Sequence, residues 1–283
     1  MNSSSQAMHS SGRTVFCIGT GFSPFSDLTR EAVEAIERCS TLFFSSECKD
    51  VFDTVGATTR HCIDLSDLFE FGTPREVAYQ RIGGRILDEL SAVSVVGWLT
   101  RGHPGLICGV TSYLMGARQD CEVVIVPGIA TIDYCLVLFP QYFAEGSFSV
   151  WNARNIVEGG AKIQNSVPAI ILQACSSTTD LHTKDYRPKP PAITDLAREL
   201  VKTFSEEHPV HVVAFSQNAL MSAGVVTLKA MELGKYPIQP SATLVVPALR
   251  PRGETRDDPR RRSRQWLDVA FESPLERFLK KLP

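Results

Sequence analysis

One stretch, residues 93–109 (VSVVGWLTRGHPGLICG), constrains the fold more than any other part of the sequence. It begins with an apolar, β-branched run that is typical of a buried parallel strand. It then breaks into residues 101–105 (RGHPG), which predict a tight turn. Ligands of α/β sheets bind outside the carboxyl ends of the strands, and glycines there remove side chains that would keep a flat cofactor away. The stretch predicts a ligand site at a sheet edge, although a turn without a ligand fits these residues equally well.

Two other predicted strands also end in glycine turns. Strand 14–19 (TVFCIG) is followed by Thr20 and Gly21, and strand 122–126 is followed by residues 127–131 (PGIAT). The third glycine of a dinucleotide fingerprint is missing after the first strand, so an NAD site of the Rossmann type is not expected. Glycine turns at successive strand ends strengthen the prediction of a ligand site.

The bulk properties exclude several classes of protein. The length of 283 residues indicates about two domains, and a net charge of −2 gives no global field that would attract nucleic acid or an anionic membrane. No apolar run reaches the ~18 residues of a membrane span, and the polar residues 1–12 indicate a disordered lead-in and no secretion signal. The eight cysteines form no CxxC pair and the six histidines no HxxxH pair, so we expect reduced core thiols, no metal site and a cytoplasmic location.

The remaining pattern alternates between strands and helices, which predicts an α/β fold. A change in composition at residues 140–147 places a boundary between α/β domains 13–142 and 143–250, followed by a basic and then amphipathic tail, 251–283. Further strands are predicted at 41–44, 169–173, 210–215 and 243–246. Helices are predicted at 28–39 (capped by Asp27), 47–55, 74–90, 111–118, 131–139 and 193–204.

The helix predicted at 74–90 carries a candidate functional pair. It opens with a proline, and Arg75 and Tyr79 are four residues apart, which places both side chains on one face. Spacing alone favours the simpler interpretation, in which the two residues form a surface pair that covers apolar area.

Four motifs in this order carry a resemblance to a known family: IGTGFSPFSDLTREAVEAI, VVGWLTRGHPGL, VVIVPGIAT and SATLVVPAL. Over about residues 13–250 the chain resembles the tetrapyrrole methylase superfamily. The resemblance implies two α/β domains that bind S-adenosylmethionine in the cleft between them, and a homodimer. The central turn usually reads Gly-Asp-Pro in that superfamily. Gly102-His103-Pro104 is instead similar to the borosin-type peptide backbone N-methyltransferases.

The same branch is matched at Asp64-Leu65, Gly72, Arg75, Tyr79, Gln173 and residues 207–210. The resemblance implies that Arg75 and Tyr79 are catalytic, and that the cofactor contacts Arg101, His103, Leu106, Ala130, Thr131, Gln173, Ala214, Ala242 and Thr243. Phe69 and Arg101 depart from the branch, because each stands where that branch has a tyrosine. The fused substrate peptide of the branch is also missing, so we expect a substrate supplied in trans.

The chemistry of methyl transfer suggests a role for the pair. A weakly acidic nitrogen must lose its proton, and a tyrosine beside a guanidinium can take it, because the positive charge is expected to lower the phenol pKa. Arg101 would add a second cation, which suits an anionic acceptor.

Four functions remain open. The first is N-methylation of a separate peptide or peptide-like small molecule in a biosynthetic pathway, and the second is C-methylation of a tetrapyrrole. The third is methylation of a protein or RNA. The fourth is a cofactor-binding module without catalytic activity, in which Phe69 and Arg101 are the substitutions that accompany the loss of activity. We expect the first, with no nucleic-acid or membrane partner.

Overall fold

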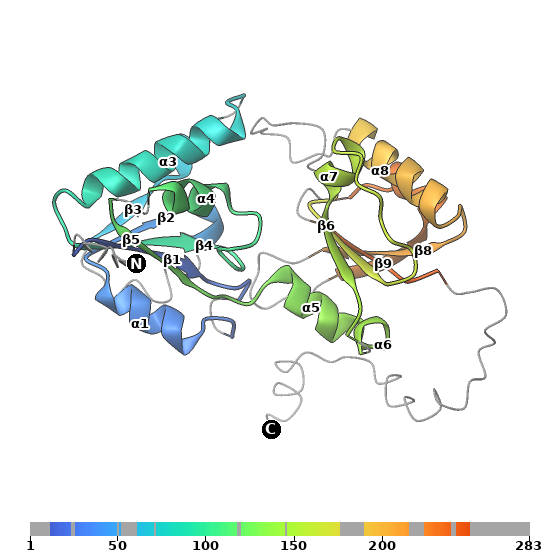
Figure 1. The fold of residues 1–283 in the computed structure, drawn as a ribbon, viewed down its shortest axis with the longest axis horizontal. Helices are drawn as coiled ribbons and strands as arrows, with labels where there is room; N and C mark the ends of the chain where they lie inside the picture. Colours follow the sequence, from blue (N-terminus) through green and yellow to red (C-terminus); the bar gives the residue numbers. More distant parts are fainter. Residues whose placement is uncertain are drawn as a thin grey trace, which may run out of the picture. The chain divides into compact units, whose positions relative to one another are not determined.

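The structure, a computed structural model, describes residues 12–23, 26–49, 51, 61–70, 72–117, 120–144, 146–175, 190–214, 224–238 and 242–249. These residues form two compact α/β units, the first up to Ala130 and the second from Thr131 onward (Figure 1). The predicted tail 251–283 and, apart from Gly12, the predicted lead-in lie outside the described residues. Among the helices in the described part of the chain, none is long and apolar enough to cross a membrane.

The first unit is built on a five-stranded parallel sheet. Its order is β3 (Cys62–Asp64), β2 (Thr41–Phe44), β4 (Val95–Thr100), β1 (Thr14–Gly19) and β5 (Glu122–Val126). The predicted central strand therefore lies in the middle of the sheet. Strand β3 was not predicted from the sequence, because three residues at an edge, none of them buried, carry too short a pattern.

Helices cover both faces of this sheet (Figure 1). Helices α3 (Arg75–Glu89) and α4 (Gly109–Gly116) lie on one face, and α1 (Arg30–Arg38) lies on the other. Successive side chains of β4 point to opposite faces of the sheet, so the strand contributes to the core on both. Trp98 packs into the cluster under α3 and α4, and Leu99 packs into the cluster under α1.

Two local predictions in this unit are corrected. Asp27 does not cap α1, because Thr29 is the N-cap and its hydroxyl accepts from the Ala32 N–H at 3.0 Å. The Asp27 carboxylate instead closes the loop after β1 by accepting from the backbone N–H groups of Phe22 (2.9 Å) and Ser23 (3.0 Å). Of the helix predicted at 47–55, the structure has a 3₁₀ turn, Ser46–Cys48, and most of residues 50–60 lie outside the described part.

The second unit contains a mixed sheet. Its order is β6 (Ser149–Asn152), β7 (Ala169–Leu172), β10 (Thr243–Val246), β8 (Pro209–Ala214) and β9 (Gly224–Lys229), in which β6 and β7 are parallel and the other pairs antiparallel. The edge strands β6 and β9 were not predicted. All six residues of β9 are at least partly exposed, so its sequence lacks the alternation that marks a half-buried strand.

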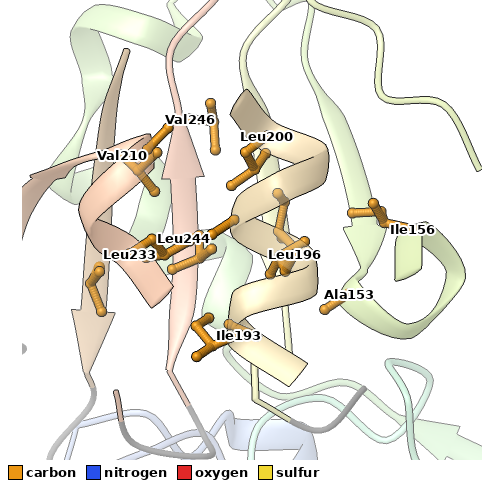
Figure 2. Packing of buried hydrophobic residues seen from close by; sticks show 14 of the residues in the cluster. Ala153, Ile156, Ile193, Leu196, Leu200, Val210, Leu233, Leu244 and Val246 are labelled. Atoms are coloured by element: carbon orange, nitrogen blue, oxygen red, sulfur yellow. The ribbon is translucent and has the colours of Figure 1, made fainter. Parts of the chain in front are cut away.

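One face of this sheet carries the main core of the unit. Helices α7 (Ala153–Val157) and α8 (Pro190–Thr203) and the 3₁₀ segment Ala230–Lys235 cover it. Figure 2 shows Leu196 and Leu200 on the side of α8 that meets Leu244 and Val246 of β10. Both leucines are fully buried.

Helices α5 (Thr131–Leu138) and α6 (Pro140–Phe143) belong to the second unit, so the division of the chain comes earlier than the predicted boundary after residue 142. His211 of β8 explains this. Its Nε2 is 2.9 Å from the Tyr142 hydroxyl, its Nδ1 is 2.8 Å from Thr227 Oγ1, and the ring of Phe139 lies 4.8 Å from its own. Burial lowers the pKa of His211, which keeps the ring neutral at pH 7.

Candidate functional site

Three glycines bring the ends of β1, β4 and β5 into backbone contact. A Cβ on Gly19 would lie 2.5 Å from the amide nitrogen of Gly128 and 2.7 Å from the carbonyl oxygen of Gly102. A Cβ on Gly128 would collide with the backbone of both other glycines. A Cβ is therefore excluded at Gly19 and Gly128, and the strand ends pack backbone to backbone at the carboxyl edge of the sheet, where the sequence predicts glycine turns.

The turn after β4 also depends on Gly102. Its φ of +74° is a left-handed conformation that glycine adopts without strain. In this conformation Gly102 donates to the Gly21 carbonyl at 2.9 Å and accepts from the Gly21 N–H at 3.3 Å. The two glycine loops predicted to form a ligand site are therefore joined directly.

His103 is held in one orientation by the residues that follow it. Its Nδ1 accepts from the Gly105 N–H at 3.0 Å, so the neutral ring carries its proton on Nε2. Its carbonyl accepts from the Leu106 N–H at 3.0 Å, which closes the turn. Backbone hydrogen bonds thus fix a half-buried donor beside the glycine edge.

Two residues of the described chain other than glycine have a positive φ: Ile107 (52°) and Gln173 (54°). Ile107 follows the glycine turn directly and is 42% exposed, and Gln173 comes directly after β7. A β-branched residue rarely adopts this conformation, and such strain concentrates at functional sites. Both outliers follow strands that the sequence places at the candidate site.

The guanidinium of Arg101 binds backbone carbonyls. Its Nε donates to the Glu47 carbonyl at 2.7 Å and its Nη2 to the same oxygen, while its Nη1 donates to the Phe22 carbonyl at 3.0 Å. These bonds use three of the five N–H groups of the guanidinium, and the role of Arg101 as a cation for an anionic acceptor stays a prediction.

Arg75 and Tyr79 do interact, one turn apart at the start of α3. Arg75 donates a hydrogen bond to the Tyr79 hydroxyl, and Arg75 Nε is buried with no hydrogen-bond partner among the described residues. Burial raises the pKa of Tyr79 above its ordinary value of 10, against the opposing charge of Arg75. The expected lowering of the phenol pKa is therefore wrong, and Tyr79 is protonated at neutral pH.

The ring of Tyr79 is positioned by a neighbouring helix. A Cβ on Gly109, the first residue of α4, would overlap this ring, and a Cβ on Gly83 would overlap the ring of Tyr113 in the same way. Each helix therefore offers a glycine to a tyrosine of the other. The two contacts fix α3 against α4 and hold Tyr79 next to the end of the loop that starts at Gly102.

Cys108 is a neighbour of Tyr79 that the sequence did not single out. Its thiol accepts from Thr111 Oγ1 at 3.2 Å and lies 3.6 Å from Thr100 Oγ1. Cys108 and Glu47 both act on Tyr79 and contribute to its raised pKa. The only signal in the sequence was the position of Cys108 between the central motif and the helix. Phe69, where the resembled branch has a tyrosine, packs against the same apolar cluster as Tyr79.

The predicted site residues in the second unit also come together. Gln173 follows β7, Ala214 ends β8, and Ala242 and Thr243 lie at the start of β10. Because β10 is antiparallel to both neighbours, these positions share one end of the sheet. The carbonyl of Ala242 accepts from the Ala174 N–H at 3.2 Å. The first unit runs up to Ala130, which is buried, and the second begins at Thr131.

Several solved structures with a similar fold are methyltransferases, and their sequence identity to the chain is low. A uroporphyrin-III C-methyltransferase from Thermus thermophilus has a TM-score of 0.58 and 17% identity, over 84% of this chain and 93% of that one. A second structure of this enzyme, complexed with S-adenosyl homocysteine, has a TM-score of 0.54 and 16% identity over 84% and 98%. A cobalt precorrin-4 methyltransferase has a TM-score of 0.55 and 13% identity over 85% and 98%.

The sequence itself gives the stronger evidence. The family model of the tetrapyrrole (corrin/porphyrin) methylases matches residues 14–215, which is more than half of the chain. No curated protein gives a significant match. The matched range contains the three glycine turns of the first sheet and three of the five strands of the second. The chain therefore belongs to the tetrapyrrole (corrin/porphyrin) methylases, a family of methyltransferases that use S-adenosylmethionine as methyl donor.

Proposed function

We propose that the chain transfers the methyl group of S-adenosylmethionine to an N–H nitrogen of a separate peptide or peptide-like small molecule. The observation that carries this proposal is the Tyr79 hydroxyl, which Arg75 holds by a hydrogen bond beside the loop that begins at Gly102. Gly102-His103-Pro104, where the family usually has Gly-Asp-Pro, supports the same branch of the family.

The residues present suit the methyl donor. We propose that it lies along the glycine edge of the first unit, near Arg101, His103, Leu106 and Ala130, and contacts Thr131, Gln173, Ala214, Ala242 and Thr243 of the second. Gly19, Gly102 and Gly128 put no side chain on this edge, and the His103 Nε2 proton is a donor for a polar group of the methyl donor. The bound sulfonium supplies an activated methyl group, and the protein supplies alignment for an in-line displacement.

Tyr79 and Arg75 supply the proton chemistry in this proposal. An amide N–H is a poor nucleophile until its proton is removed, and the raised pKa of Tyr79 means that its phenolate, once formed, is a strong base. The Arg75 guanidinium stabilises that phenolate by charge and hydrogen bond. The acceptor nitrogen loses its proton to Tyr79 and forms the new N–CH₃ bond as the S–CH₃ bond breaks.

C-methylation of a tetrapyrrole is the second candidate. The family name and the uroporphyrin-III and cobalt precorrin-4 methyltransferases of similar fold favour it. Arg75 Nε, buried and without a partner among the described residues, could receive a carboxylate of such an acceptor. Arg101 gives this candidate less support than the sequence suggested, since its guanidinium holds backbone carbonyls.

Substitution of Tyr79 separates the two candidates. Tyr79→Phe keeps the ring against Gly109 and removes the hydroxyl, so single-turnover methyl transfer to a peptide acceptor at saturating donor should fall about a hundredfold or more. Arg75→Lys should lower the rate less, since it keeps the charge and loses the planar fork. Tyr113→Phe is the matched control, because its ring packs on Gly83 in the same way, and it should methylate normally. A loss below threefold in Tyr79→Phe, or methylation of a tetrapyrrole and of no peptide, contradicts the proposal.

We also propose that the protein is a homodimer, by resemblance to its family. Light-scattering mass at micromolar concentration tests this proposal, and a monomeric mass refutes it.

A further inference from the structure

The side chain of Arg101 reaches two other loops of the candidate site. It directly follows β4, and β4 lies between β2 and β1 in the sheet. Glu47 belongs to the turn after β2, and Phe22 belongs to the loop after β1. The guanidinium therefore bridges the loops that follow both neighbouring strands.

The geometry of the bridge uses the planar fork of arginine. Nε and Nη2 both donate to the Glu47 carbonyl oxygen, with 2.7 Å from Nε, and Nη1 donates to the Phe22 carbonyl at 3.0 Å. A single ammonium is a point charge on a flexible stem and cannot reproduce this fixed arrangement of donors. The side chain is half-buried, so the hydrogen bonds are partly protected from water.

Burial of apolar side chains holds these loops only in part, since Cys48 packs into the cluster under α1 while the residues that Arg101 binds are less buried. Glu47 is exposed, and Phe22 and Ser23 are only half-buried. The loop after β1 is closed on itself by the Asp27 carboxylate, and the Gly21–Gly102 pair joins it to the turn after β4. The turn after β2 is joined to the loop after β1 by the contact between Thr20 Oγ1 and Cys48 Sγ at 3.9 Å, and the hydrogen bonds of Arg101 join it to the turn after β4 as well.

We propose that Arg101 is a positioning residue, which clamps the loops after β1 and β2 to the glycine turn after β4 and so preorganises the edge that receives the methyl donor. This inference rests on the proposed placement of the donor along that edge. A preorganised loop does not lose conformational entropy when the ligand binds, so the clamp acts on donor affinity without touching the donor.

The test measures the clamp and the binding separately. Hydrogen exchange of the ligand-free protein follows the amides of Phe22, Ser23 and Cys48, which are hydrogen-bonded within the two loops. Calorimetry with S-adenosylhomocysteine as the probe gives the affinity. The variants are Arg101→Met, which keeps the length of the side chain and removes every donor, and Arg101→Lys. Arg30→Met is the control, since Arg30 is an exposed residue of the same unit that pairs only with its own helix.

We expect faster exchange at all three amides and about tenfold weaker probe binding in Arg101→Met, with little rescue by Arg101→Lys. Arg30→Met should change neither measurement. Unchanged exchange in Arg101→Met overturns the clamp, even if affinity falls, because Arg101 would then contact the ligand directly. Faster exchange with unchanged affinity overturns the positioning role. A wild-type protein that binds no probe contradicts the proposed function instead, and the exchange data still decide the clamp.

Discussion

At the scale of single residues, burial and the charge of Arg75 have opposite effects on the pKa of Tyr79. Arg75 favours the phenolate by its charge and by a hydrogen bond, yet burial has the larger effect and raises the pKa. Glu47 and Cys108 act in the same direction as burial. A tyrosine with a raised pKa is rarely ionised at neutral pH, but its phenolate is a strong base. The rate of methyl transfer must therefore depend on pH.

We predict that methyl transfer to a peptide acceptor rises with pH by about tenfold per unit between about pH 6 and 9, because the fraction of phenolate grows in that proportion below the pKa. The acidic group has a raised pKa, so no plateau is expected below the ordinary value of 10. Arg75→Gln removes the charge that favours the phenolate and should lower the rate at every pH. A plateau near pH 8 in single-turnover rates would exclude Tyr79 as the titrating base.

Ile107 offers a second prediction at this scale. Its φ of 52° costs a β-branched residue about 1–2 kcal/mol, and glycine adopts it freely. The side chain is 42% exposed, so its removal also loses the buried part of its surface, which offsets this gain. Ile107→Gly should therefore lower the free energy of unfolding clearly less than an isoleucine or valine to glycine change at an unstrained position of similar exposure, measured by denaturant titration.

Val137 is the matched control for Ile107. It is a β-branched residue, 48% exposed, in α5, where no backbone strain is relieved, so Val137→Gly should lower the free energy of unfolding by more than Ile107→Gly does. The strain interpretation fails if both glycine variants are destabilised to the same extent.

At the scale of helices, the contact between α3 and α4 is built from two glycine–tyrosine pairs. Tyr79 meets Gly109, and Tyr113 meets Gly83, with a spacing of four residues along each helix. The matched spacing shows that the helices run in the same direction, as expected for helices on one face of a parallel sheet. The same contact fixes the position of the proposed base.

Two adjacent glycines of α3 allow a direct test of this contact. A Cβ on Gly83 would overlap the Tyr113 ring, whereas a Cβ on Gly84 meets nothing within 4 Å. Gly83→Ala should therefore destabilise the protein by about 1–3 kcal/mol through overpacking, and Gly84→Ala should stabilise it by up to about 1 kcal/mol through helix propensity. Denaturant midpoints of the two variants decide this, and equal effects would show that the helices are not in close contact.

At the scale of the whole molecule, the cysteines behave as buried apolar residues. All eight are free thiols in the structure, and burial raises the pKa of Cys17, Cys39, Cys135 and Cys175 from 9.0 to about 12. The four lie in both units. Their native forms stay protonated at a pH where the unfolded chain has already lost these protons.

This difference predicts alkaline instability. Between about pH 9 and 12 the unfolded state binds fewer protons than the native state, so each such thiol lowers the free energy of unfolding by about 1.4 kcal/mol per pH unit. Below pH 9 the thiols are protonated in both states and have no effect. Denaturant titrations with reductant should show this dependence of the free energy of unfolding on pH. Cys39→Ala removes one of these thiols and should reduce the slope by the contribution of that thiol. A stability that stays level up to pH 11 would contradict the burial of these thiols.

The sequence by itself determined the strands that carry the site. The predicted ranges 14–19, 41–44, 122–126 and 243–246 coincide with β1, β2, β5 and β10. Strands β1, β2 and β10 lie inside their sheets, where an apolar run is continuous and can be recognised locally, and the edge strand β5 carries a similar run, EVVIV. The glycine turns after β1, β4 and β5 were equally visible, because backbone contact and positive φ admit few other residues. These motifs were enough to indicate the family.

Only the tertiary structure decided what depends on partners distant in sequence. The edge strands β3, β6 and β9 have weak patterns and form because a neighbouring strand is present. Helices α5 and α6 join the second unit through His211, and Arg101 binds carbonyls at Phe22 and Glu47 that no local pattern connects to it. The pKa of Tyr79 likewise depends on how deeply folding buries the ring, and burial there outweighs the charge that the spacing of Arg75 predicts.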